Sequence, residues 1–387
     1  MRLLRVIRSV NPAGGGPVEG LKQVSTVLGA LGHRVTVASL DAPDEPGVAG
    51  FPLPLHALGH HHGGYGYAAG FVPWLRAHAR DFDAVIVDGL WQYHSLGAWR
   101  ALHRTPTPYF VYPHGMLDPW FKRTYPLKHL KKWLYWPWAE YRVLRDARAA
   151  LFTCDREREL ARESFWLYRC HERVVSFGTA DPGGDASSER EQFLAAHPQL
   201  RGRRYLVFLG RVHEKKGVDL LLRAFVQARS GPAKNLHLVI AGPGTPELFA
   251  ELKTLASALG VSERVHWTGL LQGALKWGAL RAAEAFVLAS HQENFGLAVV
   301  EALACGVPVL ISDQVNICHE IERDGGGFVA RDALAETTAM LDRWAALPEA
   351  EHTQMRRRAR ACFEQRYEIQ RVAQQLATTL NESGVAG

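Results

Sequence analysis

One stretch of the sequence decides how the rest is interpreted: residues 290–309 read SHQENFGLAVVEALACGVPV. The apolar run Ala285–Leu288 before it predicts a buried strand, and the pattern after Gly296 predicts a helix. Glu293 then lies on the loop between them, and Glu301 lies on the helix. Because an ideal helix turns about 80° past two full turns over eight residues, the two carboxylates need the loop to converge on one ligand. Carboxylates accept hydrogen bonds from hydroxyls, so a sugar or a ribose would suit them.

Phosphate-binding groups are expected beside this loop. Gly296 and Leu297 would present free N–H groups at the helix N-terminus, where an anion is favoured. A second run, residues 209–217 (LGRVHEKKG), closes another apolar strand and carries Arg211 and Lys216. A guanidinium fork and an ammonium at the carboxyl end of a strand suit a diphosphate. Taken alone, this run is equally consistent with a solvated basic loop.

The rest of the chain alternates apolar strands with helices, which indicates parallel sheets covered on both faces. The pattern breaks in a polar, turn-rich stretch near residues 181–203 and then restarts with a new first strand. We therefore predict an α/β chain of two Rossmann-like, doubly wound domains facing a cleft, residues 1–183 and 184–367, with a tail helix over 368–387 packing back on the first. The predicted strands are Leu3–Arg8, Val35–Ala38, Ala84–Val87, Tyr109–Tyr112, Leu151–Thr153, Val174–Phe177, Tyr205–Leu209, His237–Ala241, Arg264–Trp267, Ala285–Leu288 and Val307–Ile311.

These motifs together resemble a known family. Residues 205–330 look like the C-terminal domain of a family 4 glycosyltransferase, a retaining enzyme with the GT-B fold, because they carry its G-R-x4-K-G motif, its E-x7-E pair and the run EALACGVPV. The resemblance implies a donor-binding C-terminal domain in which Arg211 and Lys216 bind the diphosphate of a nucleotide sugar. It also implies that Glu293 contacts the donor hexose and that Glu301 holds the nucleotide ribose.

The same resemblance gives a role to the residues after Glu293. In the family, the amides of this loop reach the sugar and the phosphate of the donor. The residues implied here are Asn294, Phe295, Gly296 and Leu297.

The N-terminal half agrees with the family more loosely and would form the acceptor-binding domain. Residues 112–117 (YPHGML) resemble the P-H-G-M segment of bacterial members that build surface polysaccharides. In the family a histidine at this place lies beside the donor sugar, which implies a catalytic role for His114. Gly15 and Gly16 follow the first strand and precede a helix, so their backbone is expected to approach a phosphate or sugar. A tight turn with no ligand is the alternative for these glycines.

The resemblance implies transfer of a hexose, with retention, from a UDP- or GDP-sugar to a glycan or lipid-linked acceptor. The setting would be biosynthesis of an exopolysaccharide, a lipopolysaccharide or a glycolipid. Arg211, Lys216 and the helix amides would meet the charge that grows on the leaving diphosphate, so we expect neither a cofactor nor a metal. The D-x-D sequence at 81–83 precedes a strand, and we interpret it as a helix-to-strand turn. We interpret the adjacent histidines 60–62 as part of a mobile loop over 60–64, not as a metal site, since their side chains diverge.

Other classes of function remain open. One is a nucleotide-sugar epimerase or hydrolase on the same fold, and another is a non-catalytic subunit that binds a nucleotide sugar or a membrane. Nucleic-acid binding is not expected, because 45 Lys and Arg against 39 Asp and Glu is a mild excess without a recognised motif. With 47% hydrophobic residues the chain can form a core, which excludes global disorder.

Residues 120–145 are unusual, since they combine four of the 11 Trp with seven Lys and Arg and one acid. That mixture fits an interfacial helix on an anionic membrane, although Pro137 would kink it. The alternative is a core helix whose basic residues face solvent. The chain has no apolar run long enough to span a bilayer, and Met1–Arg8 is too short and too charged for a signal peptide. We therefore expect a cytoplasmic protein that is peripheral at the inner membrane.

Overall fold

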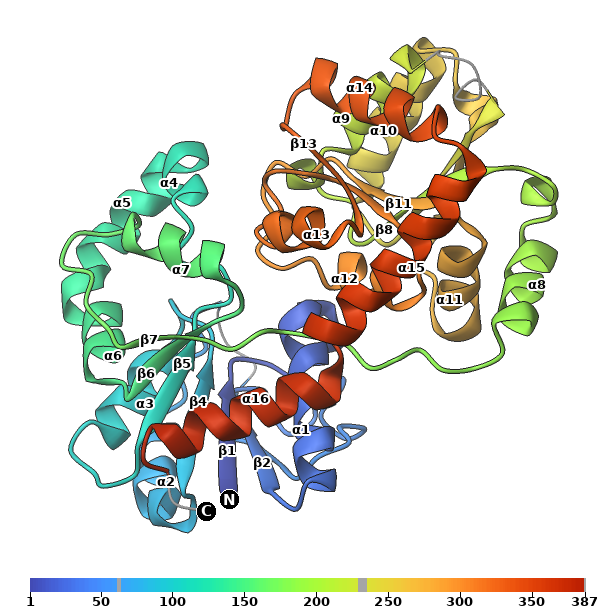
Figure 1. Cartoon of the computed structure of the whole chain (residues 1–387). Helices are drawn as coiled ribbons and strands as arrows, with labels where there is room; N and C mark the ends of the chain where they lie inside the picture. The colour runs from blue at the N-terminus through green and yellow to red at the C-terminus, as the bar shows by residue number, and fades with distance from the viewer. Residues whose placement is uncertain (61–63, 229–234, 386–387) are drawn as a thin grey trace. The chain divides into compact units, whose positions relative to one another are not determined.

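The chain folds into two compact units, Met1–Ala180 together with Ile369–Gly387, and Asp181–Glu368. The structure is a computed structural model that describes residues 1–60, 64–228 and 235–385 (Figure 1). The sequence pattern predicts a break between residues 183 and 184, whereas the units divide three residues earlier, between Ala180 and Asp181. Most of the loop expected at 60–64 falls on residues 61–63, which lie outside the described residues.

The first unit is built on a seven-stranded parallel sheet with the order β3-β2-β1-β4-β5-β6-β7. Its central strands are mostly apolar and almost entirely buried, as expected for a parallel sheet. The strand order reverses between β1 and β4, since β2 and β3 lie on one side of β1 and the later strands lie on the other. The strands are β1 (Arg2–Ile7), β2 (Arg34–Ser39), β3 (Leu55–Ala57), β4 (Ala84–Asp88), β5 (Tyr109–Tyr112), β6 (Ala149–Phe152) and β7 (Glu172–Val174).

Helices cover both faces of this sheet. They are α1 (Gly16–Ala30), α2 (Phe71–His78), α3 (Tyr93–Leu102), α4 (Trp120–Thr124), α5 (Pro126–Tyr135), α6 (Glu140–Asp146), α7 (Asp155–Arg162) and α16 (Ile369–Glu382), with 3-10 turns η1 (Pro12–Gly14), η2 (Ala79–Asp81) and η3 (Trp136–Trp138). Neighbouring residues of a strand point to opposite faces. Leu3 and Ile86 pack with α1 and α16, which lie side by side (Figure 1). Leu4 and Val87 pack on the other face with residues of α2, α3 and α6.

The second unit repeats this plan with a six-stranded parallel sheet of order β10-β9-β8-β11-β12-β13. Its strand order reverses between β8 and β11. The strands are β8 (Tyr205–Leu209), β9 (His237–Ala241), β10 (Val265–Gly269), β11 (Ala285–Leu288), β12 (Val309–Ser312) and β13 (Gly327–Ala330). The helices are α8 (Ala186–Ala196), α9 (Val218–Gln227), α10 (Pro246–Ala258), α11 (Gly273–Ala282), α12 (Leu297–Ala304), α13 (Cys318–Asp324), α14 (Leu334–Ala345) and α15 (Glu349–Arg366), with 3-10 turns η4 (Pro198–Leu200), η5 (Glu214–Lys216) and η7 (Ser262–Arg264).

The prediction of an α/β chain with two Rossmann-like, doubly wound domains is confirmed. Strands β5, β8, β9 and β11 have the predicted bounds, whereas β3 and β13 were not predicted. The strand predicted at 174–177 is wrong, because β7 ends at Val174. Its neighbour β6 ends at Phe152, so the ladder has no partner beyond that point.

The segment 120–145 is not one long helix but four short pieces, α4, α5, η3 and α6. Pro126 and Pro137 each stand in the first turn of a new piece, where a missing N–H costs nothing. Trp136 is fully buried, whereas Trp138 is 70% exposed, so the segment contributes both to the core and to the surface. Across the described chain, no helix has both the length and the apolar character needed to cross a bilayer.

Candidate functional site

In the second unit, the sequence-predicted donor residues lie beside the point where the strand order reverses. The loop after β8 carries Arg211 and Lys216, and the loop after β11 carries Glu293. Such a reversal leaves a crevice outside the carboxyl ends of the strands, because the connections on its two sides run in opposite directions. The two loops are therefore placed where ligands bind in sheets of this kind.

An ion pair joins these two loops. The Lys216 ammonium contacts the Glu293 carboxylate, and the two side chains are 14% and 15% exposed. The main chain supports the pair, because the N–H of His291 and the hydroxyl of Ser290 both donate to the carbonyl oxygen of Lys215, each at 2.8 Å. The structure thus brings together Lys216 and Glu293, which lie far apart in the sequence.

Gly217 permits this close approach. Its φ is 60°, and a Cβ atom there would lie 1.9 Å from the carbonyl oxygen of Ala289. Side chains other than glycine rarely adopt this left-handed conformation, and no Cβ fits at that distance. The last glycine of the G-R-x4-K-G motif is therefore required by the packing of one loop on the other.

Positive charge is concentrated at the end of β8. Arg211 is exposed, and the described residues supply no ion-pair partner for it. Burial, with the charges of Lys215 and Arg211, lowers the pKa of Lys216, and the contact with Glu293 opposes this by favouring the ammonium. These cations together favour an anion with more than one negative charge, because the single carboxylate of Glu293 neutralises only part of their positive charge.

The backbone around Glu293 is fixed by the loop after β12. The N–H of Glu293 donates to the carbonyl of Gln314, and its carbonyl accepts from the N–H of Asn316, both at 3.0 Å. The side-chain amide of Asn316 also donates to Oδ1 of Asn294 at 3.2 Å. The main chain at Glu293 is therefore held by several contacts, and its side chain is held by Lys216.

The next residues form the start of α12. Gly296 is the N-cap with φ 79°, and Leu297 is the first helical residue, as the sequence predicts. The side chain of Phe295 is buried, with its ring edge-on to Tyr367 at 5.7 Å between centroids. The side chain of Phe295 therefore serves packing, and the predicted contact of this loop with a ligand would come from backbone N–H groups.

Glu301 has a partner that sequence reasoning missed. It is 7% exposed on α12, and its Oε1 lies 3.0 Å from the Nζ of Lys276 on α11. A carboxylate on a buried helix face needs a cation or several hydrogen bonds. A glutamate within an apolar helix is therefore the signal that a cationic partner lies nearby. No motif marks Lys276 itself. The E-x7-E carboxylates thus lie in two separate ion pairs, with Lys216 and with Lys276.

The remaining predicted site residues belong to the first unit. Gly15 is the N-cap of α1 with φ 73°, and a Cβ atom on Gly15 or Gly16 would have nothing within 4 Å. This open backbone leaves room for a ligand but does not by itself indicate one. His114 follows β5, also with a positive φ, 49°. These three residues are thus not in the unit that carries the loops after β8 and β11.

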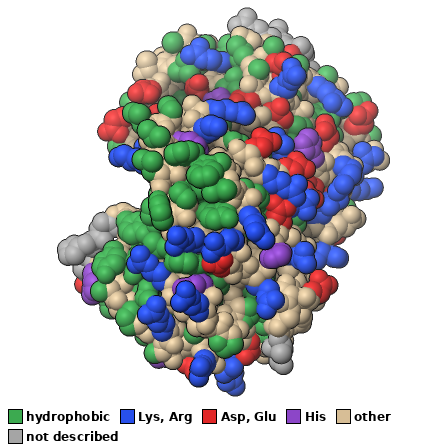
Figure 2. All heavy atoms as spheres, turned by 90° about the vertical axis from the view of Figure 1, so that its left-hand side faces the viewer, with side chains coloured by type: hydrophobic (Ala, Val, Ile, Leu, Met, Phe, Trp, Pro, Cys, Tyr) green, Lys and Arg blue, Asp and Glu red, His purple; other side chains and the backbone are tan. Residues whose placement is uncertain are grey.

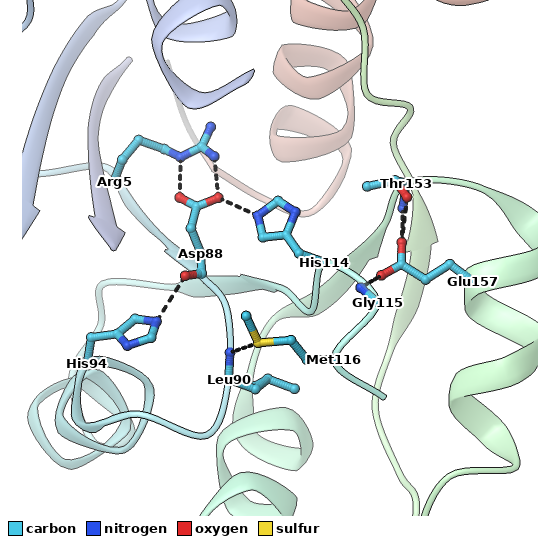
Figure 3. Close-up of polar contacts among 9 residues, drawn as sticks. All are labelled: Arg5, Asp88, Leu90, His94, His114, Gly115, Met116, Thr153 and Glu157. Atoms are coloured by element: carbon cyan, nitrogen blue, oxygen red, sulfur yellow. Dashed lines mark hydrogen bonds and ion pairs between the residues drawn. The ribbon is translucent and has the colours of Figure 1, made fainter. Parts of the chain in front are cut away.

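His114 belongs to a polar network that sequence reasoning did not find (Figure 3). Its Nε2 lies 3.0 Å from Oδ1 of Asp88, the last residue of β4. Arg5 of β1 donates twice to the same carboxylate, at 2.8 and 2.5 Å. Burial alone would raise the pKa of Asp88, but the charge of Arg5 and the hydrogen bonds from His114 and Arg5 outweigh it and hold the pKa below its usual value.

The D-x-D sequence spans the last residue of η2 and the turn before β4, as predicted. Asp83 accepts a hydrogen bond from the Arg2 side chain at 2.8 Å, which is a structural role at the amino end of the sheet. Within the ranges that the structure describes, no group of three or more His, Cys, Asp or Glu side chains is arranged to hold a metal ion.

Comparison with known proteins finds a similar domain family for each unit. Residues 15–178 match the glycosyl transferase 4-like domain, and residues 189–361 match the glycosyl transferases group 1 family. Each match falls within one of the two units. Alpha-D-kanosaminyltransferase of Streptomyces kanamyceticus is 27% identical over 67% of this chain and 59% of its own length. Mannosylfructose-phosphate synthase of Agrobacterium fabrum is 29% identical over 44% of this chain and 38% of its own length, so the match spans only part of each relative.

Solved structures show that this pair of domains has the GT-B fold. Sucrose-phosphate synthase from Thermosynechococcus elongatus superposes with a TM-score of 0.80 at 18% identity, covering 99% of both chains. HepE of Anabaena, in complex with UDP-glucose, superposes with a TM-score of 0.79 at 17% identity, covering 99% of this chain and 100% of its own.

The first prediction concerns Gly217. We expect Gly217→Ala to destabilise the second unit by more than the roughly 1–2 kcal/mol of left-handed strain, because Cβ would also clash with Ala289. Gly202→Ala is the matched control, since Gly202 has φ 72° and open space around it. Thermal unfolding of both variants separates the two costs. Equal losses for the two variants would contradict the loop-packing role.

The second prediction concerns His94 of α3, whose Nε2 lies 2.9 Å from the carbonyl oxygen of Asp88. Burial lowers the pKa of His94 to about 4, so the unfolded chain binds more protons between about pH 6.5 and 4, and stability must fall as the pH falls through that window. We expect the wild type to lose about 2 kcal/mol more than His94→Gln between pH 7 and pH 5, measured by urea unfolding. If the wild type and His94→Gln lost the same free energy of unfolding over this range, the pKa of His94 would not be lowered, and the prediction would be contradicted.

Proposed function

We propose that the chain is a retaining glycosyltransferase that moves a hexose from a UDP- or GDP-sugar to a glycan or lipid-linked acceptor. The observation that carries this proposal is the Lys216–Glu293 ion pair, which joins the loops after β8 and β11 where the strand order reverses. The two matched domain families and the complexes of HepE with UDP and UDP-glucose support it. The setting would be polysaccharide or glycolipid biosynthesis.

The donor would exchange partners with the ion pair. Its diphosphate would take the Lys216 ammonium, and exposed Arg211 would add a bidentate contact. Glu293 would then be free to accept hydrogen bonds from hydroxyls of the hexose. Because each group leaves one partner only to gain another, the donor satisfies both charges at once.

The chemical step would be helped by charge stabilisation. As the bond from the sugar to the diphosphate breaks, negative charge grows on the leaving oxygen. Arg211, Lys216 and the N–H groups at the start of α12 would meet that charge, in the role that a divalent metal has in other transferases. Glu301, held by Lys276, would accept hydrogen bonds from the ribose. Retention at the anomeric carbon is proposed on the resemblance of these motifs to the family.

The third prediction tests the donor site. In a thermal-shift panel of UDP-, GDP- and ADP-sugars, we expect one class to stabilise the protein by about 2.7 kcal/mol at a hundredfold excess over its Kd. We expect Glu293→Gln to reduce transfer by roughly 100-fold or more, because it removes a contact to the reacting sugar. Glu263→Gln, an exposed acid before β10, is the control.

The rival functions give different outcomes in the same assays. Release of free sugar or an epimer without an acceptor would indicate a hydrolase or epimerase. A thermal shift with no turnover, and a cellular phenotype unaffected by Glu293→Gln, would indicate a non-catalytic subunit. No shift with any nucleotide sugar would contradict the donor site itself.

We also propose that the first unit binds an anionic membrane surface, which would make the protein peripheral at the inner membrane. Leu127, Leu130 and Leu134 of α5 recur at helical spacing and are 79%, 54% and 61% exposed. Trp133 lies against Trp166, with ring centroids 5.8 Å apart. We call the aromatic–basic face the exposed set Leu127, Leu130, Trp133, Leu134, Trp138 and Trp166 with Lys122, Arg123, Lys128 and Lys131.

Charge favours lipid as the partner of this face. Residues 119–139 contain no Asp or Glu, so the cations of the aromatic–basic face are not neutralised within their own segment. Figure 2 turns the side with α4 and α5 to the viewer and shows hydrophobic side chains gathered beside Lys and Arg. Exposed tryptophans suit the headgroup region, and each cation near an anionic surface contributes about 1 kcal/mol.

The fourth prediction is that the protein sediments with vesicles containing phosphatidylglycerol at low salt, but not with pure phosphatidylcholine vesicles. Burying one leucine contributes about 1.5–3 kcal/mol, so Leu134→Glu should weaken binding at least tenfold. Leu270→Glu is the matched control, because Leu270 of the second unit is 60% exposed. Protein that stays in the supernatant at low salt, or equal losses in the two variants, would contradict the proposal.

A further inference from the structure

A hollow of about 530 Å³ lies between the C-terminal ends of α2 and α3 in the first unit. The two helices lie side by side (Figure 1), and the segments that follow them lead into the neighbouring strands β4 and β5. Both segments therefore reach the amino ends of the strands, whereas Gly15 and His114 follow the carboxyl ends of β1 and β5. The hollow is thus at the opposite edge of this sheet from the site residues predicted in the same unit.

Positive charge lines this hollow. Its lining includes four arginines and a histidine, which are Arg76, Arg80, Arg100, His103 and Arg104. No acidic residue is among the described residues of the lining, and residues 46–80 and 89–117 contain no Asp or Glu. Within the described parts of the chain, none of the four guanidiniums has a carboxylate partner. The charge is therefore neutralised neither by the lining nor by the segments that carry it.

The helix ends account for part of this charge only. The C-terminal end of a helix carries unpaired carbonyl groups, so a cation there is favoured. Arg76 has this role, because its Nη2 donates to the carbonyl oxygen of Arg100 at 3.1 Å. Arg80 and Arg104 follow the last residues of α2 and α3, are exposed, and donate to no carbonyl of the described residues. Their guanidiniums are available to a ligand.

Hydrogen bonds hold the walls of the hollow in place. The bond just described joins α2 to α3, and the buried hydroxyl of Thr107 donates to the carbonyl oxygen of Ala79 at 3.0 Å. The ring of His103 stacks on Trp99 with centroids 4.5 Å apart, and its Nδ1 donates to the carbonyl oxygen of Trp99 at 2.8 Å. The hollow is therefore formed without a ligand, so little conformational entropy would be lost in shaping it.

The chemistry of the lining favours a phosphate group. A guanidinium binds two phosphate oxygens in parallel, and a phosphate ester carries about 1.5 to 2 negative charges at neutral pH, more than a carboxylate does. Buried Ala79 and Ala101 belong to the lining and leave space that longer side chains would fill. Sites for small molecules have volumes of about 300–1,000 Å³, a range that includes this hollow.

We propose that the hollow between the ends of α2 and α3 is an anion site that binds a phosphate group, carried either by a free small molecule or by the headgroup of a membrane lipid. Arg80 and Arg104 bind the phosphate oxygens, and Arg76 adds positive charge. The site lies within one unit and shares no residue with the loops after β8 and β11. It therefore does not depend on the proposed function.

The test is titration calorimetry of the full chain with inorganic pyrophosphate. Arg80→Ser/Arg104→Ser is compared with Arg34→Ser/Arg148→Ser, which removes the same charge from exposed arginines outside the lining. We expect the first variant to bind one pyrophosphate roughly 100-fold more weakly, because each lost guanidinium contact weakens binding at least tenfold, and the control to bind like the wild type. Pyrophosphate bound at the loops after β8 and β11 is common to both variants and cannot produce this difference. Equal binding by the two variants would overturn the proposal.

Vesicles containing phosphatidylglycerol decide the source of the phosphate. If Arg80→Ser/Arg104→Ser loses pyrophosphate and also sediments less with these vesicles than the control does, the ligand is a lipid headgroup. Loss of pyrophosphate with unchanged sedimentation assigns the site to a free small molecule.

A second variant keeps the test valid if Arg80→Ser/Arg104→Ser does not fold. Ala77 is an exposed residue of α2 that belongs to the lining, so Ala77→Glu places a carboxylate in the hollow. We expect Ala77→Glu to weaken pyrophosphate binding at least tenfold, because the carboxylate both repels the anion and pairs with the arginines. Wild-type binding in this variant would overturn the proposal.

Discussion

The reversal of strand order beside the first strand of each sheet is the constraint on which both candidate sites depend. In the first unit β1 and β4 flank the reversal, and they supply Arg5 and Asp88. In the second unit β8 and β11 flank it, and the loops that follow them supply Lys216 and Glu293. The chain thus places an ion pair at the same topological position twice. The difference is that one pair comes from the strands themselves and the other from loops.

The two pairs also differ in burial, and this difference decides what each pair can do. Removing the Arg5–Asp88 pair from water is expensive, and once it is formed the loss of either partner leaves an uncompensated charge, so the pair is a permanent part of the fold. The side chains of Lys216 and Glu293 are each about one-seventh exposed, 14% and 15%, and they lie beside Arg211, which is exposed. Water and a ligand can reach that pair. The first is suited to fixing a geometry, and the second is suited to exchanging partners.

Sequence reasoning found the elements that repeat a strong pattern and missed those that do not. Continuous apolar runs such as Tyr205–Leu209 predicted the strands, but β3 has only three residues at the sheet edge, and β13 begins with a glycine. The motif glycines and acids were found because their spacing is local. Lys276 and Asp88 were missed because their meaning comes from partners brought close by folding, Glu301 for one and Arg5 for the other. Pattern alone does not show such pairs.

The proposed exchange of partners at Lys216 and Glu293 bears on how a donor would be selected. A bare diphosphate would satisfy Lys216 but would leave the Glu293 carboxylate, which is mostly buried, without its cation. A free sugar would satisfy Glu293 only in competition with Lys216. Leaving a buried charge unpaired costs free energy. The binding free energy of a ligand that carries both a diphosphate and hydroxyls would therefore exceed the sum for its two fragments. In the proposed function, the ion pair would therefore disfavour either fragment alone, and both loops together would favour an intact nucleotide sugar.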